Sequence, residues 1–367
     1  IIRAENQKLQ KLSIQEIYNL EPFFNFCFKT FLIKFVFLWI ITKITPAVKK
    51  LIFILFTLLF GLNVNAQLSN KHWIPPLHAN ESQDPGLIKQ HYIYLSTPEP
   101  TPFQVTIKDG SGNPFNLGTY TISQGNPVRV TIGTGQPSTM MVDRSDVGHV
   151  ISGKGLIIEG QYDFYVNFRV RADNHAEFLA SKGRTGVGKV FRLGSLPQID
   201  FGTIRNFVSS FMATEDNTTV NLSQYNSTIT FINGNNTFSS ANQTFTLNEG
   251  ESVVISGYSE ANGANLDGFV GALLESDKPI VVNTGNLAGG MNNSGFGQDF
   301  NLDQIVPLEQ VGQEYVIMKG NGSDVTERPL VIAHEDNTEV YINGNATPIT
   351  TLNAGQFILI PTSLFTG

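Results

Sequence analysis

Short runs of alternating apolar and polar residues, separated by turns, make up most of the chain after residue 67. Residues 128–132 (Val-Arg-Val-Thr-Ile) are typical of these runs, which are rich in β-branched and aromatic side chains. Asp-Asn and Asn-Gly pairs lie between them, as at Asn233-Gly234 and Asn343-Gly344, and such pairs favour the tight turns of hairpins. No long apolar period of 3.6 residues occurs there. The pattern therefore predicts an all-β fold.

One strand-turn-strand pattern recurs along this region. The motif Ala-x-Glu-Asp-Asn-Thr-x-Val occupies residues 213–220 and again residues 333–340, and a degenerate copy spans residues 94–107. A second shared element follows each copy: an apolar residue, two further residues and a glycine, leading into an alternating strand. Its glycines are Gly125, Gly250 and Gly355. Recurrence at a fixed spacing is the mark of a repeat architecture.

A third element, a pair of strands, occurs twice. Residues 156–167 align without a gap to residues 272–283, and no third copy appears before Gly367. The spacing predicts three repeated antiparallel β modules, of β-sandwich or propeller-like type, with the third truncated and sequence missing beyond it. The predicted parts are an extended lead-in at 67–90, repeat 1 at 91–203, repeat 2 at 204–312 and repeat 3 at 313–367.

The N-terminal segment has the order of a secretory signal. Lys49-Lys50 precedes ten mostly apolar residues, and small side chains at Val64 and Ala66 precede Gln67. We predict a signal peptide at 48–66, cleavage after Ala66, and an exported mature chain at the cell surface or outside the cell. Residues 1–47 are either translated upstream sequence that is not native to the protein or a membrane segment, and the absence of an initial Met favours the first.

Charge and cysteine content narrow the partners and the chemistry. Residues 1–66 hold 8 of the 24 basic and 3 of the 31 acidic residues, so the rest carries 16 basic and 28 acidic side chains, a net charge of −12. An acidic surface repels phosphate backbones, so we expect no nucleic-acid partner, and membrane contact only through the N-terminal segments. The single Cys27 leaves the predicted β region without thiols, which excludes disulfides, zinc-cysteine clusters and cysteine catalysis there.

Several motifs together resemble a known family. They are the two Ala-x-Glu-Asp-Asn-Thr-x-Val copies, residues 276–286, residues 303–312, Ser181-Lys182-Gly183 and residues 327–330 (Glu-Arg-Pro-Leu). In combination, over roughly residues 67–367, they resemble the N-terminal domain of IgGFc-binding proteins, as it occurs in large secreted proteins of gliding bacteria. The resemblance implies a surface-exposed binding or adhesion role and a longer parent protein with a C-terminal sorting domain for type IX secretion. It does not imply that this chain binds antibody.

Two motifs suggest bound ions or phosphates, and each has a simpler structural reading. Residues 183–190 nearly match a P-loop, but Val190 stands where the motif requires Ser or Thr, and the next residues favour a strand over a helix. The turns at residues 215–217 and 335–337 (Glu-Asp-Asn) cluster oxygens as calcium sites do, without the spacing of an EF-hand. We favour turn chemistry, leave calcium open, and expect no other cofactor.

A catalytic site is not indicated. Glu159 and Glu275 have the residue type of a glycosidase pair, but they recur at one repeat position, whereas an active site is normally single. The histidines show no metal-ligand spacing on one element; they are His72, His78, His91, His149, His175 and His334. We therefore assign no catalytic, cofactor-binding or metal-binding residue, and the binding residues stay unassigned.

The sequence favours a secreted cell-surface binding or adhesion domain without catalysis, an N-terminal fragment of a larger adhesin-like protein that displays loops to an extracellular glycan or protein. A structural stalk or spacer is the first alternative, and a secreted glycan-active enzyme is the second.

Overall fold

The computed structural model describes residues 67–79, 88–172, 175–197, 205–290, 299–320 and 327–365. The predicted signal peptide at 48–66 and the prefix at 1–47 lie outside these residues. The C-terminal compact unit begins at Asn65 and contains every element described below. No helix within the described ranges is long and apolar enough to cross a membrane.

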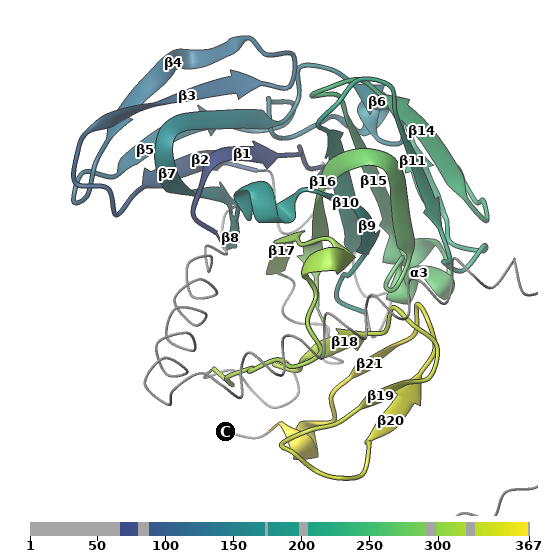
Figure 1. Cartoon of the computed structure of the whole chain (residues 1–367). Helices are drawn as coiled ribbons and strands as arrows, with labels where there is room; N and C mark the ends of the chain where they lie inside the picture. Colours follow the sequence, from purple (N-terminus) through teal and green to yellow (C-terminus); the bar gives the residue numbers. More distant parts are fainter. Residues whose placement is uncertain are drawn as a thin grey trace, which may run out of the picture. The chain divides into compact units, whose positions relative to one another are not determined.

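The first large sheet is antiparallel and runs in the order β4-β3-β7-β2-β5, with β1 and β8 also paired to β7. Its strands are β1 (Ser69–Ile74), β2 (Gln90–Ser96), β3 (Phe103–Asp109), β4 (Pro114–Ile122), β5 (Val128–Gly133), β7 (Leu156–Arg171) and β8 (Ala176–Ala180). The long strand β7 bends strongly (Figure 1), so its first half pairs with β3 and its second half with β2.

The second large sheet runs in the order β14-β11-β16-β10-β15-β6, with β9 and β17 also paired to β16. Its strands are β6 (Val150–Ile151), β9 (Gly188–Arg192), β10 (Asn206–Ala213), β11 (Thr218–Ser223), β14 (Gln243–Leu247), β15 (Ser252–Tyr258), β16 (Leu273–Gly289) and β17 (Asp299–Ile305). The strand β16 is bent like β7 (Figure 1). Apart from β6, the second sheet repeats the topology of the first, with β9, β10, β11, β14, β15, β16 and β17 in the places of β1, β2, β3, β4, β5, β7 and β8.

Three two-stranded sheets complete the β structure of the described residues. They pair β12 (Phe231–Asn233) with β13 (Asn236–Phe238), β18 (Leu330–Ile332) with β21 (Phe357–Leu359), and β19 (Thr338–Val340) with β20 (Thr350–Leu352). The helical elements are single turns: η1 (Arg144–Asp146), η2 (Gly183–Gly186), η3 (Ser259–Ala261), α3 (Ala264–Asp267), η4 (Leu308–Gln310) and η5 (Thr362–Leu364). The prediction of an all-β, antiparallel fold is confirmed.

The registers of the bent strands agree with the gap-free alignment of the sequence. Ile158 of β7 pairs with Ile107, and Leu274 of β16 pairs with Leu222, so aligned residues occupy equivalent places in the two sheets. The pairs β18–β21 and β19–β20 have the connections of β10–β15 and β11–β14. The count of three modules and their boundaries stay predictions. In sequence, β6 and β9 fall within the predicted first repeat, although both pair with strands of the second sheet.

The large sheets enclose two main apolar cores. The first includes Ile93, Ile158 and Phe168 of the first sheet, together with second-sheet residues such as Val208 and Leu287, so it joins the two sheets. The second includes Phe211 and Leu274 of the second sheet, and all the residues named here have no exposed surface. These residues come from the apolar positions of the alternating runs, which face one side of a strand. Burying a side chain of this size contributes about 1.5–3 kcal/mol relative to leaving it exposed.

Candidate binding site

The two large sheets meet where two glycine-containing turns approach each other closely. Gly250 has a φ of +77°, and a Cβ added there would lie 2.0 Å from the carbonyl oxygen of Gly110, in the turn after β3. A side chain therefore does not fit between these backbones. Beside this contact β6 pairs with β15, through Val150 with Val253 and Ile151 with Ser252. We call this contact the first junction.

The second junction joins the second sheet to the C-terminal hairpins with a similar glycine contact. Gly355 follows the second Ala-x-Glu-Asp-Asn-Thr-x-Val motif as Gly250 follows the first, and it has a φ of +79°. A Cβ added at Gly271 would lie 1.9 Å from the carbonyl oxygen of Gly355. Arg192 also spans the second junction. Its Nη1 donates to Gly271 O at 2.9 Å, and its Nε and Nη2 donate to His334 Nδ1 and O, both at 3.3 Å.

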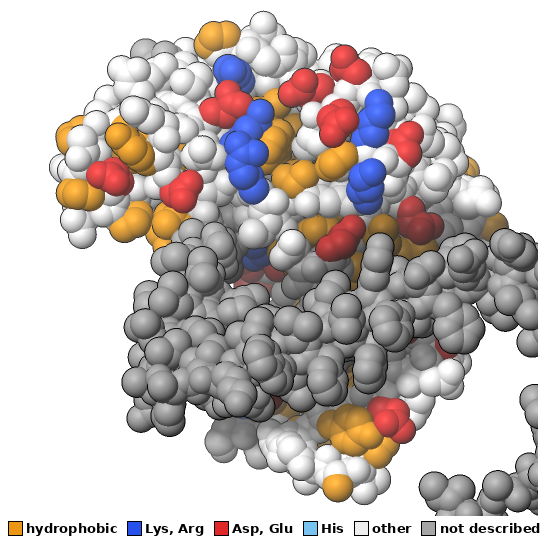
Figure 2. Space-filling model, viewed as in Figure 1, with side chains coloured by type: hydrophobic (Ala, Val, Ile, Leu, Met, Phe, Trp, Pro, Cys, Tyr) orange, Lys and Arg blue, Asp and Glu red, His pale blue; other side chains and the backbone are white. Residues whose placement is uncertain are grey.

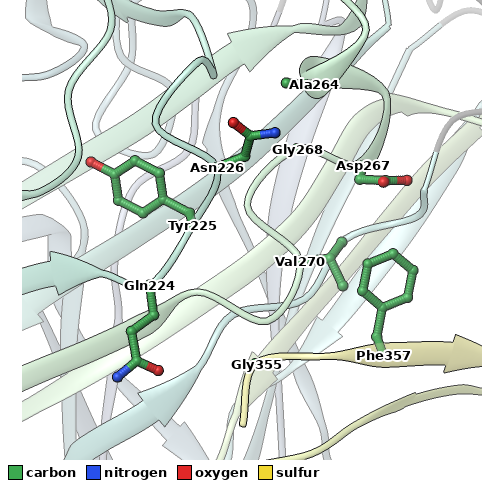
Figure 3. Close-up of a pocket in the computed structure, with 9 residues that line it drawn as sticks. All are labelled: Gln224, Tyr225, Asn226, Ala264, Asp267, Gly268, Val270, Gly355 and Phe357. Carbon is green, nitrogen blue, oxygen red and sulfur yellow. The ribbon is translucent and has the colours of Figure 1, made fainter. Parts of the chain in front are cut away.

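A pocket opens at the second junction because the local structure differs there from the first. The gap-free alignment begins at residues 156 and 272, and if its offset is extended towards the N-terminus, α3 (Ala264–Asp267) falls at the place of residues 148–151, which include β6. Among the described residues β21 pairs with β18 and has no pairing like that of β15 with β6. The space left has a volume of about 250 Å³, somewhat below the range of pockets for drug-sized ligands. Its walls are Gln224, Tyr225, Asn226, Ala264, Asp267, Gly268, Val270, Gly355 and Phe357 (Figure 3). We call it the junction pocket.

Each of two facing sides of the junction pocket contributes both polar and aromatic side chains. Figure 3 shows the Phe357 ring beside Val270, with the Asp267 carboxylate on the same side, whereas Gln224 and Asn226 come from the loop after β11. Phe357 is half-buried, and the Asp267 residue is exposed. Burial of the carboxyl group nevertheless raises the pKa of Asp267 above its usual value, because partial desolvation disfavours the charged form.

The oxygens of the two amides accept hydrogen bonds from neighbouring residues. Gln224 Oε1 accepts a hydrogen bond of 2.8 Å from Arg192, and Asn226 Oδ1 accepts bonds of 3.0 and 2.8 Å from the backbone N and the hydroxyl of Thr228. Tyr225 contributes its ring, packed edge-on against Phe231 at a centroid distance of 5.2 Å. The arrangement suits a small polar ligand with hydroxyl groups and one apolar face, such as a sugar ring.

The aspartates of the two Glu-Asp-Asn turns accept hydrogen bonds from backbone N–H groups of other turns. Asp216 Oδ1 accepts the backbone N–H of Glu249 at 3.0 Å, and Asp336 Oδ1 accepts that of Ala354 at the same distance. Each turn is thus tied to the glycine turn that enters a junction. Oxygens engaged in this way support the turn-chemistry interpretation over calcium. Within the described residues, no group of three or more His, Cys, Asp or Glu side chains could hold a metal.

The structure places the other motifs singled out in the sequence in turns and strands. Residues 183–186 form the turn η2, and the strand β9 follows it, so the helix that a P-loop requires is not there. Glu159 lies in β7 and Glu275 in β16, each in its own sheet. Both Lys71 and Lys108 bind Glu159, with Nζ–O distances of 2.6 and 3.1 Å, and these bonds lower the pKa of its carboxyl.

A buried polar network links β1 and β8 to the second sheet. His72 Nε2 lies 3.0 Å from the backbone oxygens of Ser69 and Phe164, which can only accept, so Nε2 carries the proton. Its Nδ1 lies 3.0 Å from Ser181 Oγ, which also lies 3.0 Å from Gln304 Oε1. His72 has no exposed surface, Ser181 is 1% exposed and Gln304 has none. A substrate cannot reach this Ser-His pair, so we assign it a structural role.

Burial of His72 predicts a loss of stability in mild acid. Desolvation lowers its pKa from 6.5 to about 4, despite the two backbone hydrogen bonds that favour the charged form. As the pH falls from 6.5 to 4, the unfolded chain takes up a proton that the folded chain does not. The free energy of unfolding therefore falls over this window, by about 3 kcal/mol from His72. Urea unfolding at pH 7 and pH 4.5 measures the loss.

The matched variant is His72→Gln, whose amide can still donate to the two carbonyls. Its free energy of unfolding should fall less than that of the parent over the same pH interval. Equal losses in the two proteins would show that His72 does not titrate as its burial requires. His91 is also buried and has a pKa lowered to about 4 by desolvation, so it adds a loss of the same sign in both proteins.

Sequence reasoning missed the junction pocket. Gln224, Tyr225 and Asn226 follow β11 in a loop that the repeat pattern does not cover, and Asp267 lies where the sequence gives no repeat element. No sequence signal marks this loop, because the positive φ of +57° at Gln224 is a property of the structure alone. On the face shown in Figure 2, Lys and Arg side chains are interspersed with Asp and Glu, so the visible described side chains form no patch of one charge.

Comparison with known proteins identifies one family. A family model described as IgGFc binding protein matches residues 176–365, which is more than half of the chain. The match includes both Ala-x-Glu-Asp-Asn-Thr-x-Val motifs and every residue of the junction pocket. No curated protein and no solved structure matches the chain.

Proposed function

Because the chain belongs to the IgGFc-binding protein family, we propose that residues 67–367 form an exported domain that binds a glycan at the cell surface through the junction pocket. The family is one of binding domains. The observation that carries the proposal is the pocket itself, where Phe357, Asp267 and the amides of Gln224 and Asn226 surround a space of about 250 Å³.

The chemistry of these groups favours a sugar over a peptide or a nucleotide. An aromatic ring packs against the apolar C–H face of a pyranose, while carboxylate and amide groups bind its hydroxyls. No Lys or Arg lines the pocket, which disfavours phosphate. In this proposal the chain is an adhesin-type domain of a longer parent protein, exported through the signal at 48–66, and it carries out no catalysis.

A glycan and protein array probed with the purified chain tests this proposal. We expect binding to one class of glycan, with Asp267→Asn and Phe357→Ala each weakening it by at least about tenfold, the usual effect of losing a hydrogen bond to a charged group or an aromatic contact. The array includes the Fc part of immunoglobulin G, because the family name refers to it. Glu260→Gln is the matched control, since Glu260 is an exposed carboxylate that does not line the pocket.

Glycan binding that both pocket variants retain at full strength would place the ligand elsewhere and refute the assignment of the pocket. Binding to Fc alone, equally strong in both pocket variants, would have the same consequence.

The alternative function, a stalk or spacer, is favoured by the recurrence of the glycine contact at both junctions. Close contacts between glycine backbones at each junction limit how neighbouring sheets can move relative to each other. Stacked repeats gain stability from such interfaces. In this case the chain would bind no glycan or protein on the array.

A further inference from the structure

We propose that the two C-terminal hairpins, β18–β21 and β19–β20, are an acceptor site for one more bent β-strand. The strand is supplied by polypeptide C-terminal to β21 and has the residue pattern of β7 and β16. This inference holds whether or not the junction pocket binds a glycan.

The first observation is the pairing of the hairpins. In both large sheets a bent strand joins two hairpins into one sheet: β7 lies between β3 and β2, and β16 lies between β11 and β10. The hairpins β18–β21 and β19–β20 correspond to β10–β15 and β11–β14. Within the described residues, however, β18 pairs with β21 alone and β19 with β20 alone. The edges that a bent strand covers elsewhere are therefore unpaired here.

The second observation is the register. Phe211 of β10 pairs with Val253 on one side and with Val282 of the bent strand on the other. Val331 of β18 pairs with Ile358, and both Val253 and Ile358 lie three residues after the glycine of their turn. Val331 thus occupies the place of Phe211, and the edge of β18 opposite β21 is the one that β16 covers in β10.

The third observation is the state of the core. Phe211, Leu222 and Val253 in the second sheet have no exposed surface. Their counterparts Val331, Ile342 and Ile358 are only partly buried around a small cluster. In the second sheet, Ile280 and Val282 of the bent strand pack in the same core as those fully buried residues. A strand with apolar residues at these positions would complete the C-terminal core in the same way.

The fourth observation is an exposed apolar segment that precedes the hairpins. Val311-Gly312 follows η4 as Val187-Gly188 follows η2, and each valine N–H bonds to the carbonyl oxygen three residues earlier, that of Leu308 or of Arg184. After Gly188 the chain enters β9, which pairs with the first half of β16. After Gly312 the described residues up to 320 form no strand. Among them, Tyr315, Val316, Ile317 and Met318 are 63%, 92%, 55% and 87% exposed. Such a run is rare on a soluble surface unless something covers it.

The chain order identifies the occupant. The strands that correspond to β21 are β5 in the first sheet and β15 in the second. The bent strands β7 and β16 come after them in the chain, each following a connection with little regular structure. A second copy of the chain has no such strand to offer, because its β7 and β16 are paired on both sides. The expected pattern is three apolar residues, a glutamate, four variable residues, then apolar, any, apolar and asparagine, as in residues 156–167 and 272–283.

The test extends the full chain after Gly367 with a Gly-Ser linker and a copy of residues 272–289. A matched extension carries proline at the copied positions of Leu274 and Val282. Proline has no backbone N–H to donate to a neighbouring strand, so it should prevent the extension from pairing. Hydrogen exchange is measured on peptides that cover β18, β19 and residues 315–318. We expect exchange at least about tenfold slower in the chain with the intact extension than in the proline-containing one. Unchanged exchange in peptides from β10 and β15 would confirm that both proteins keep their fold.

Equal exchange rates in the two extended chains would overturn the proposal. The proposal would also be overturned if exchange at β18 and β19 in the unextended chain became slower as the protein concentration increased. A second copy of the chain would then be the occupant.

Discussion

Replacing Gly250 with alanine should cost the protein at least about 3 kcal/mol of its free energy of unfolding, whereas the same change at Gly125 should cost about 1 kcal/mol. The two glycines occupy the same place in the shared turn, with φ values of +77° and +78°. Both substitutions therefore impose the same strain of a left-handed backbone on alanine. Only the Cβ at Gly250 meets another backbone, 2.0 Å from Gly110 O, whereas nothing lies within 4 Å of a Cβ at Gly125.

The difference between the two variants thus measures the first junction and not the turn. Urea unfolding of both proteins provides the comparison. A backbone carbonyl cannot rotate away as a flexible side chain can, so the two turns must move apart and the β6–β15 pairing should loosen. If the two substitutions had equal effects, the close contact between the turns would be absent in solution.

Replacing Gln304 with alanine is the second change with a large expected effect, about 3–5 kcal/mol of destabilisation. Its Nε2 donates to Trp73 O at 2.8 Å and to Asn283 Oδ1 at 3.2 Å, and its Oε1 accepts the N–H of Lys182 at 2.7 Å. The side chain has no exposed surface. Its removal leaves buried polar groups without partners and opens a cavity between β1, β8 and the second sheet.

The matched control is Asn301→Ala on the same strand, β17. Asn301 is exposed, whereas Gln304 faces inward, so the control should change the free energy of unfolding by no more than about 0.5 kcal/mol. Thermal or urea unfolding distinguishes the two variants. A Gln304→Ala protein as stable as the Asn301→Ala protein would mean that the buried network contributes little to the contact between the sheets.

The sequence predicted the strands, and which strands occupy equivalent places in the two large sheets, better than it predicted the contacts between the sheets. Alternation of apolar residues and the Asp-Asn turns indicated antiparallel hairpins, because these signals are local in the chain. The gap-free alignment of residues 156–167 with 272–283 anticipated that both segments occupy the same place in their sheets. The prediction that each segment is a pair of strands was wrong: each belongs to one bent strand, β7 or β16, that bridges two hairpins. Such pairing depends on partners far away in the chain.

The junction pocket could not be predicted for a related reason. It arises because α3 replaces a strand pairing at one junction only, and a four-residue helical turn leaves no periodic signal. Gly271 and Gly355 are ordinary turn glycines in the sequence, and their contact appears only once the sheets are placed together. The Glu-Asp-Asn motifs were correctly associated with turns, but the hydrogen bonds that tie them to the glycine turns required the structure.

Binding at the junction pocket is tested most directly by hydrogen exchange of the chain with and without the glycan that gives the strongest array signal. The proposal predicts slower exchange at residues 224–226 and 264–270 when the glycan is present, and no such change in the Asp267→Asn protein. Protection confined to other segments, with these two unchanged, would contradict it.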